Sequence, residues 1–142
     1  MIEYTTTLDI KTMQDLRLEL NIALKNTKDI ELTNNDTGLK ASISQHEINK
    51  ISNPKAVHKS IANGFNKEEH FEIAKHIATL YQLAKLHKKH IDNKGRGWEV
   101  YRLVANVKVN NKQAQIKITA FKKQVGKNRI YTIELGRLNL LP

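Results

Sequence analysis

The chain has 142 residues, which is enough for one domain but not for two, and we treat residues 1–142 as a single domain. It contains no cysteine, which excludes a disulfide framework and a thiolate metal site, and no apolar run approaches the ~18 residues needed to cross a bilayer. The formal net charge of +10 at pH 7 favours a polyanionic partner. Nucleic acid is the first candidate, and an acidic protein or a merely solvated basic surface are the alternatives.

The first predicted elements are a short strand and a helix. Residues 1–7 are β-prone with unknown pairing, and they have neither the basic start nor the apolar core of a signal peptide. The absence of cysteine fits a cytoplasmic site of action. From Thr12 to about Asn26, apolar residues recur at helical spacing, and Thr12 with Asp15 three residues later forms an N-cap. We expect this helix to pack against the core and to carry no chemistry.

A small hairpin and a short helix follow. Asn34–Gly38 is rich in residues that tolerate the left-handed backbone of turns, so residues 29–33 and 39–44 on either side are predicted to pair as a hairpin. The Ser-Gln-His-Glu sequence that comes next has capping-box spacing. That spacing predicts a short helix over residues 44–51.

Two further helices complete the helical part of the chain. Pro54 suits the first position of a helix that runs to Asn63 and ends at Gly64. Asn66 caps the next helix, which we expect to continue to Ala84 because apolar residues repeat along one face. The buried stripe of that helix consists of Ile73, Ala74, Ile77, Leu80, Tyr81 and Ala84.

The excess of positive charge lies in the C-terminal part of the chain. Residues 1–84 hold ten basic and eleven acidic residues, a net charge of −1, whereas residues 85–142 hold fourteen basic and three acidic residues, a net charge of +11. Asp92–Gly97 reads as a mobile basic loop. We therefore divide the domain into a helical part, about 10–84, and a basic β-sheet part, about 85–142.

Residues 98–138 predict three consecutive strands joined by two tight turns. Asn110-Asn111 suits a two-residue turn, because Asn accepts the positive φ that such turns need. This turn gives one apolar face by pairing Val109 with Lys112, Val107 with Ala114, Ala105 with Ile116 and Leu103 with Ile118. A second turn around residues 124–127 pairs Ile118 with Ile133 and Ala120 with Tyr131. We predict an α+β fold, with N-terminal helices packed on one face of a C-terminal antiparallel sheet of three to four strands and a small extra hairpin.

The opposite face of this sheet is polar. Its two rows are Arg102–Thr119–Thr132 and Val104–Lys117–Glu134. The rows lie inside the basic part of the chain, which favours a working surface for RNA, although such pairs are also ordinary stabilisers of a solvated sheet face. Phe121 is the one aromatic residue assigned firmly to this face, and Tyr131 falls on the core-facing row near the end of the sheet, so base stacking has little support.

Metal and cofactor sites are not expected. The chain has no glycine-rich phosphate loop followed by Lys-Ser or Lys-Thr. His87 and His90 are three residues apart, but the lysines between and around them would repel a cation. The basic part has Asp92, Glu99 and Glu134 as its only acids, too few for a magnesium-dependent nuclease.

Metal-independent RNA cleavage requires a base, an acid and a cation around one phosphate, because the RNA supplies its own 2′-OH nucleophile. The predicted catalytic residues are His58, Arg102, Lys117, Thr119 and Thr132. His58 is chosen for proton transfer, with an uninvolved surface histidine as the alternative. The predicted RNA-binding residues are Lys59, Lys88, Lys89, His90, Arg96, Lys122 and Lys123.

Several of these segments resemble a known group of proteins. They are the run Ser52–Phe65 around Ala56-Val57-His58-Lys59, and the strand segments Arg102–Val107, Gln113–Thr119 and Ile130–Leu135. In pattern and order they resemble phage polyvalent-protein domains and bacterial toxin domains of the barnase–EndoU–colicin–RelE-like nuclease superfamily, from about Ile30 to the C-terminus.

The resemblance implies helices followed by a four-stranded antiparallel sheet, and metal-independent ribonuclease activity, often on tRNA. It also implies an acidic immunity protein or antitoxin as a partner. The helix histidine of the family corresponds to His58, and the basic and hydroxyl positions of the sheet to Arg102, Lys117 and Thr119. A catalytic glutamate of the barnase kind is missing from the sheet, since Glu134 lies beside Lys117.

The sequence therefore predicts an endoribonuclease toxin domain that cleaves RNA through a 2′,3′-cyclic phosphate. Two alternatives stay open: a non-catalytic nucleic-acid-binding accessory module of a phage or mobile-element protein, and a protein-interaction domain with an acidic partner. The lack of a targeting segment suits a domain delivered within a larger secreted or phage protein, and equally a small cytosolic protein.

Overall fold

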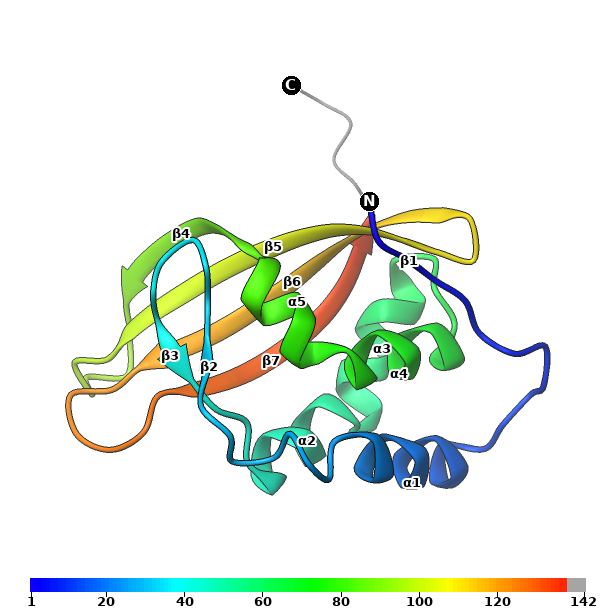
Figure 1. Cartoon of the computed structure of the whole chain (residues 1–142), viewed down its shortest axis with the longest axis horizontal. Helices are drawn as coiled ribbons and strands as arrows, with labels where there is room; N and C mark the ends of the chain where they lie inside the picture. The colour runs from blue at the N-terminus through cyan, green and yellow to red at the C-terminus, as the bar shows by residue number, and fades with distance from the viewer. Residues whose placement is uncertain (138–142) are drawn as a thin grey trace.

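The computed structural model describes residues 1–137, which form five helices, a five-stranded sheet and a separate two-stranded sheet (Figure 1). The helices are α1 (Met13–Ala23), α2 (Gln45–Ile51), α3 (Pro54–Ala62), α4 (Lys67–Lys75) and α5 (Ile77–Leu83). The strands are β1 (Glu3–Tyr4), β2 (Leu32–Thr33), β3 (Lys40–Ala41), β4 (Lys85–Ile91), β5 (Glu99–Val109), β6 (Lys112–Lys122) and β7 (Arg129–Arg137).

The helix starts follow from local capping chemistry. The side chains of Thr12, Asn53 and Asn66 each accept a hydrogen bond from a backbone N–H in the first turn of α1, α3 and α4. A capping box with Glu47 begins α2. The predicted starts of these four helices are confirmed. The helix expected over residues 66–84 is broken at His76 into α4 and α5. The buried stripe continues through the break, so periodicity alone does not reveal it.

The predicted layout of helices followed by an antiparallel sheet of three to four strands is wrong. The sheet has five strands and is mixed, because β1 pairs in parallel with β5, with Glu3 opposite Lys108. The helices therefore lie between the first strand and the other four in the order of the chain. β1 has two residues, too few for a period-2 pattern, and a parallel partner needs a long crossover that no turn signal marks.

The register of the central hairpin is confirmed. Asn110 and Asn111 have φ angles of 48° and 66°, and Val109 lies opposite Lys112 as predicted. The pairing continues without a shift to Glu99 and Lys122. A single face of β5 and β6 therefore points into the core.

The next hairpin contains a β-bulge that the sequence analysis did not predict. Thr119 lies opposite Thr132, but Ala120 then lies opposite Ile130, not Tyr131. The extra residue in β7 releases Tyr131 from the predicted pairing. Its ring instead packs 4.6 Å from that of Phe121, and both side chains line a cleft on the other face of the sheet.

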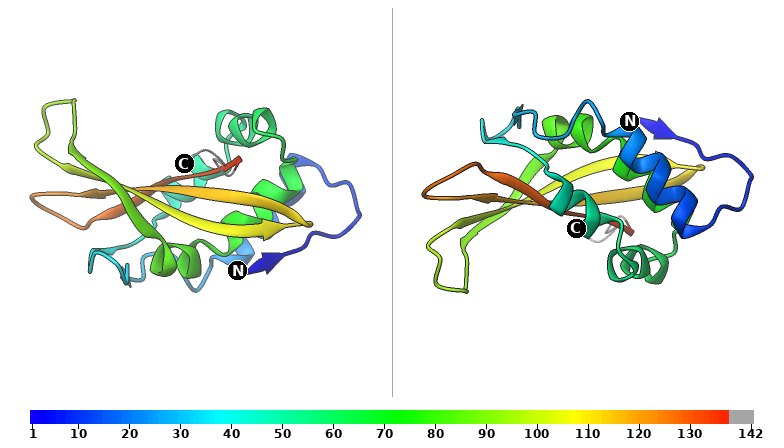
Figure 2. Two further views of the ribbon diagram at one scale, coloured as in Figure 1. Left: turned by 90° about the horizontal axis from the view of Figure 1, so that it is seen from above. Right: turned by 90° about the horizontal axis from the view of Figure 1, so that it is seen from below.

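The core forms where the apolar face of the sheet meets the helices. In Figure 1 α5 crosses in front of the sheet and the other helices lie below it, with α2 and α3 packed along β7. The core is built from fully buried residues of both layers, among them Leu20, Ile73, Ile77, Leu103, Ile116 and Ile133. Figure 2 shows the β4–β5 and β6–β7 hairpins projecting from the end of the sheet opposite the β5–β6 turn.

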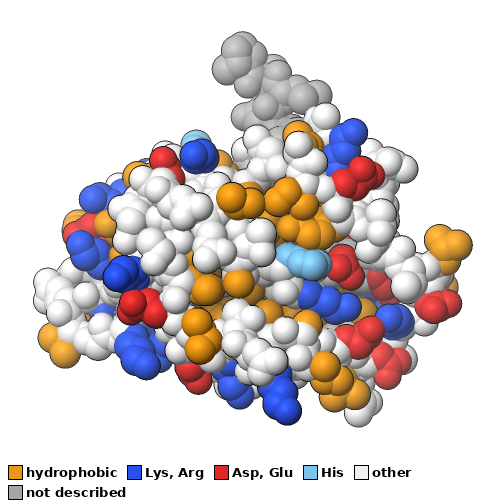
Figure 3. All heavy atoms as spheres, viewed as in Figure 1, with side chains coloured by type: hydrophobic (Ala, Val, Ile, Leu, Met, Phe, Trp, Pro, Cys, Tyr) orange, Lys and Arg blue, Asp and Glu red, His pale blue; other side chains and the backbone are white. Residues whose placement is uncertain are grey.

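The helical side of the molecule carries a mixed charge. Figure 3 looks onto the helices and shows Asp and Glu side chains interspersed with Lys and Arg. This agrees with the net charge of −1 of residues 1–84, which contribute all five helices. The excess of basic residues belongs to β4–β7 and their loops.

Acid should weaken the fold through one buried histidine. His70 is fully buried; its Nε2 donates to the Ile51 carbonyl at 2.8 Å, so its Nδ1 accepts from the Ser60 hydroxyl at 2.7 Å. Burial lowers the pKa of His70, opposed by the Ile51 carbonyl and by Glu134. The folded chain then binds fewer protons than the unfolded chain once the pH falls below about 6.5.

We therefore expect the free energy of unfolding to decrease between pH 6.5 and the lowered pKa of folded His70, by up to about 1.4 kcal/mol per pH unit from this group. Urea titrations at a series of pH values measure the slope. His70→Gln should flatten it, whereas His46→Gln, at an exposed histidine of α2, should not. An unchanged slope in His70→Gln would assign the acid sensitivity to other groups.

Candidate functional site

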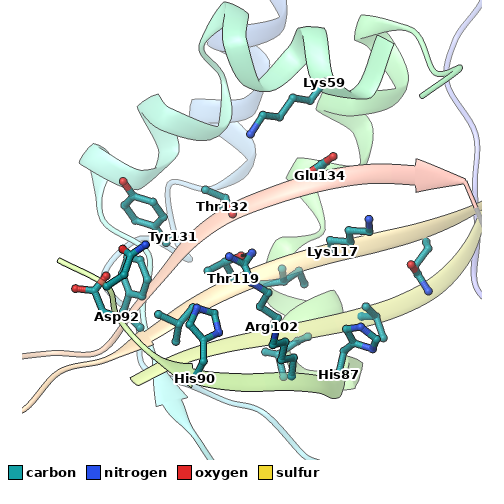
Figure 4. Close-up of a pocket in the computed structure, with 18 of the residues that line it drawn as sticks. Lys59, His87, His90, Asp92, Arg102, Lys117, Thr119, Tyr131, Thr132 and Glu134 are labelled. Atoms are coloured by element: carbon teal, nitrogen blue, oxygen red, sulfur yellow. Dashed lines mark hydrogen bonds between the residues drawn. The ribbon is translucent and has the colours of Figure 1, made fainter. Parts of the chain in front are cut away.

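A cleft of about 840 Å³ lies on the sheet face that the helices leave open (Figure 4). Strands β4, β5, β6 and β7 form its floor, and Lys59 of α3 reaches over it from the β7 side. Because side chains alternate between faces, the residues of β5 and β6 that point into the cleft lie between those that point into the core. The apolar core face therefore determines which residues form the cleft.

A polar row crosses the middle of the cleft. Arg102 of β5, Thr119 of β6 and Thr132 of β7 lie side by side, as predicted. The Arg102 guanidinium donates to the Thr119 hydroxyl at 3.4 Å, and the Thr119 side chain is nearly buried. Lys117 and Glu134 form the neighbouring row. The row places a cation and two hydroxyls where they can donate to one phosphate group.

The cleft has a surplus of positive charge. Lys59, Lys88, Arg102 and Lys117 all line it, and none of them makes an ion pair within residues 1–137. The acids of the lining are Glu134 and Asp92. Asp92 is already paired with Arg96 at 2.7 Å, and this hydrogen bond holds the pKa of Asp92 below its usual range. The free cations suit a polyanion.

Two histidines of β4 border the row. Figure 4 shows His90 and His87 on either side of Arg102. His90 is half-buried, and its Nδ1 is shielded from solvent without a hydrogen-bond partner among the described residues. A buried polar atom normally has a partner. Because Nδ1 is shielded, the other ring nitrogen of His90, Nε2, is the one that a group bound in the cleft can reach. His87 is exposed at the cleft edge.

Within residues 1–137 no group of three or more His, Cys, Asp or Glu side chains is arranged to hold a metal ion. Over the same residues, no helix combines the length and the apolar character needed to cross a membrane.

Comparison with known families decides what kind of domain this is. Residues 11–131 match the model of the family described as large polyvalent protein-associated domain 3. The chain belongs to this family. None of the curated proteins and none of the solved structures that were compared matches it.

The resemblance to polyvalent-protein domains is thereby confirmed, whereas the match does not extend to the nuclease superfamily. The match covers β4, β5 and β6, and it ends at Tyr131, near the start of β7. Membership in a polyvalent-protein-associated family fits a domain that is part of a larger protein.

The polyvalent-protein-associated domain brings most of the predicted site together. The cleft gathers seven of the predicted residues: Lys59, Lys88, His90, Arg102, Lys117, Thr119 and Thr132. The others do not line it: His58, Lys89, Arg96, Lys122 and Lys123. His58 is exposed on α3, one residue from Lys59. Lys89 alternates to the other face of β4 and pairs with Glu99 at 3.4 Å.

Several cleft residues of this polyvalent-protein-associated domain are not among the predicted site residues. Tyr131 lines the cleft because of the bulge in β7, and His87 because the β4 pairing shifts between Leu86 and Lys88. The bulge in β7 breaks the two-residue alternation on which the prediction of that strand rested, whereas β4 itself was not predicted as a strand. One feature of the sequence could have indicated the bulge in β7. The predicted pairing of Ala120 with Tyr131 places a large ring opposite a small residue.

Proposed function

We propose that the cleft binds RNA and cleaves it without a metal ion, through attack of a ribose 2′-OH on the adjacent phosphate. The observation that carries this proposal is that the half-buried His90 lines the same cleft as Arg102 and Thr119. Proton transfer and stabilisation of phosphate charge are the two requirements of the reaction, and these residues supply both. His90 replaces His58 in this role, since His58 does not line the cleft.

The reaction needs two proton transfers around one phosphorus atom. One histidine takes the proton of the 2′-OH as O2′ bonds to phosphorus, and the other gives a proton to O5′ as the P–O5′ bond breaks. The products are a 2′,3′-cyclic phosphate and a 5′-hydroxyl. His90 and His87 stand on either side of Arg102, so the two can serve a phosphate held between them. Arg102 and Thr119 donate to the phosphate oxygens, where negative charge increases in the transition state.

The free cations set the class of substrate and partner. Lys59, Lys88 and Lys117 can contact phosphates on either side of the scissile one, which favours a polynucleotide over a mononucleotide. We expect tRNA among the substrates. An acidic immunity protein or antitoxin would compete for the same cations, because it would neutralise the surface that RNA needs.

The test is a digest of total RNA by the purified domain in EDTA, read on a denaturing gel. We expect discrete fragments that end in a 2′,3′-cyclic phosphate, identified because their 3′ ends can be labelled only after the cyclic phosphate has been opened and the phosphate removed to leave a free 3′-hydroxyl. Intact RNA bound in a salt-sensitive manner would leave the non-catalytic accessory module as the function. Cleavage that requires magnesium would overturn the proposed mechanism.

A further inference from the structure

Three aromatic rings lie in succession at one end of the cleft. The ring of Tyr131 is 4.6 Å from that of Phe121, and the ring of Phe121 is 5.7 Å from that of Trp98. Phe121 and Tyr131 line the cleft itself, and Trp98 is half-buried beside them at the start of β5. We call these three residues the aromatic platform.

Two cations lie over the outer ring of the aromatic platform. The guanidinium carbon of Arg96 is 3.8 Å from the centre of the Trp98 ring and 5.4 Å from that of Phe121. The ammonium group of Lys123 is 4.8 Å from the Trp98 ring. A guanidinium is planar and stacks on aromatic rings, so Arg96 takes a position that another flat group could take.

Arg96 is held in place by a single ion pair. Its Nε donates to the Asp92 carboxylate at 2.7 Å, within the loop between β4 and β5. The Arg96 side chain is exposed, whereas the Asp92 side chain is only 6% exposed, so the pair anchors the guanidinium beside the Trp98 ring. A flat group that stacks on Trp98 from this side must displace the Arg96 guanidinium from the ring.

The aromatic platform is next to the proposed phosphate site. Phe121 is two residues from Thr119 on β6 and points to the same face, about 7 Å along the strand. This separation is within the span of one nucleotide. A phosphate at Arg102 would therefore place a neighbouring base beside Phe121, which is 8% exposed, and over Trp98 once Arg96 has left that ring.

We propose that Trp98, Phe121 and Tyr131 form a subsite for an unpaired nucleobase next to the scissile phosphate, with Arg96 as its displaceable cover. This inference rests on the proposed function and narrows its substrate to single-stranded segments of RNA. A base inside a duplex has both faces covered by its neighbours, whereas an unpaired base can stack on a protein ring. The subsite makes no demand on base identity, because every base has a flat face.

Trp98 is the only tryptophan of the chain, so intrinsic fluorescence reports directly on the subsite. The probes are a single-stranded 2′-O-methyl oligoribonucleotide, the same backbone with abasic positions, and the same strand annealed to its complement. The 2′-O-methyl group removes the nucleophile, so the probe stays intact. We expect all three to bind at low salt, but only the single strand with bases to quench Trp98.

Phe121→Leu keeps an apolar side chain in the sheet while removing a ring of the subsite. We expect it to weaken binding of the base-containing strand about 5- to 150-fold, measured by anisotropy of a labelled probe, with binding of the abasic strand unchanged. Equal quenching by the abasic strand, or none by any probe, would overturn the subsite. Quenching without any RNA cleavage would retain the subsite and remove the nuclease, so the two proposals fail separately.

Discussion

Replacement of Arg102 by alanine is expected to lower the rate of RNA cleavage about 100- to 1,000-fold, because the guanidinium is the cation nearest the centre of the cleft. The fold should survive, since Arg102 is exposed and its side chain makes one long hydrogen bond, 3.4 Å to Thr119. The measurement is the initial rate of cleavage in EDTA, together with thermal unfolding to confirm that the variant is folded.

Two further variants test whether Arg102 acts through the shape of its guanidinium group or only through its positive charge. Arg102→Lys keeps the charge but not the planar fork that matches phosphate oxygens, so we expect part of the activity to return. Lys25→Ala removes one positive charge from an exposed position outside the cleft and should leave the rate unchanged. If Lys25→Ala slows cleavage as much as Arg102→Ala, general electrostatic attraction would explain both results.

The second large expected effect is a difference in cleavage rate between variants of His90 and of His58. His90→Ala should lower cleavage about 100- to 10,000-fold, the range for loss of a proton-transfer group. His58→Ala should leave cleavage near the wild-type rate, because His58 is exposed on α3 and does not line the cleft. The rates are compared in EDTA at several pH values, with RNA concentrations high enough to compensate for weaker binding.

The binding of uncleaved RNA provides the control for His90. A variant that has lost only proton transfer should bind a 2′-O-methyl oligonucleotide within a few-fold of the wild type, whereas a misfolded cleft would not bind it. The reverse result, with His58→Ala inactive and His90→Ala active, would move the site from the sheet face to the exposed face of α3.

Local patterns predicted the elements that depend on neighbouring residues. Two consecutive asparagines, Asn110 and Asn111, predicted the β5–β6 turn because Asn accepts a positive φ, and both have one in the structure. The position of this turn determines the register of the eleven residue pairs of β5 and β6. The side-by-side placement of Arg102 and Thr119 therefore follows from the amino-acid sequence alone. The same holds for the capped starts of α1, α3 and α4, since a cap and its partner lie within one turn.

Features that depend on distant contacts could not be predicted. The position of α3 relative to the sheet decides that Lys59, and not His58, reaches the cleft, and nothing within α3 specifies that orientation. The bulge at Tyr131 breaks the alternation without a glycine or proline to mark it. The aromatic platform depends on this bulge, so regular alternation along β7 gave no indication of base stacking.

The pairing of β1 with β5 has a consequence for how the chain reaches its fold. The Thr6 backbone N–H donates to the Asn110 side chain across a sequence separation of 104 residues. Closing so long a loop costs entropy before the contact is gained, and chains with many such contacts fold slowly. During synthesis the first strand must wait until β5 has emerged, and the helices can pack on one another before their sheet exists. Attachment of β1 is then the late step, so the β1 edge of the sheet forms after the consecutive hairpins of β4–β7.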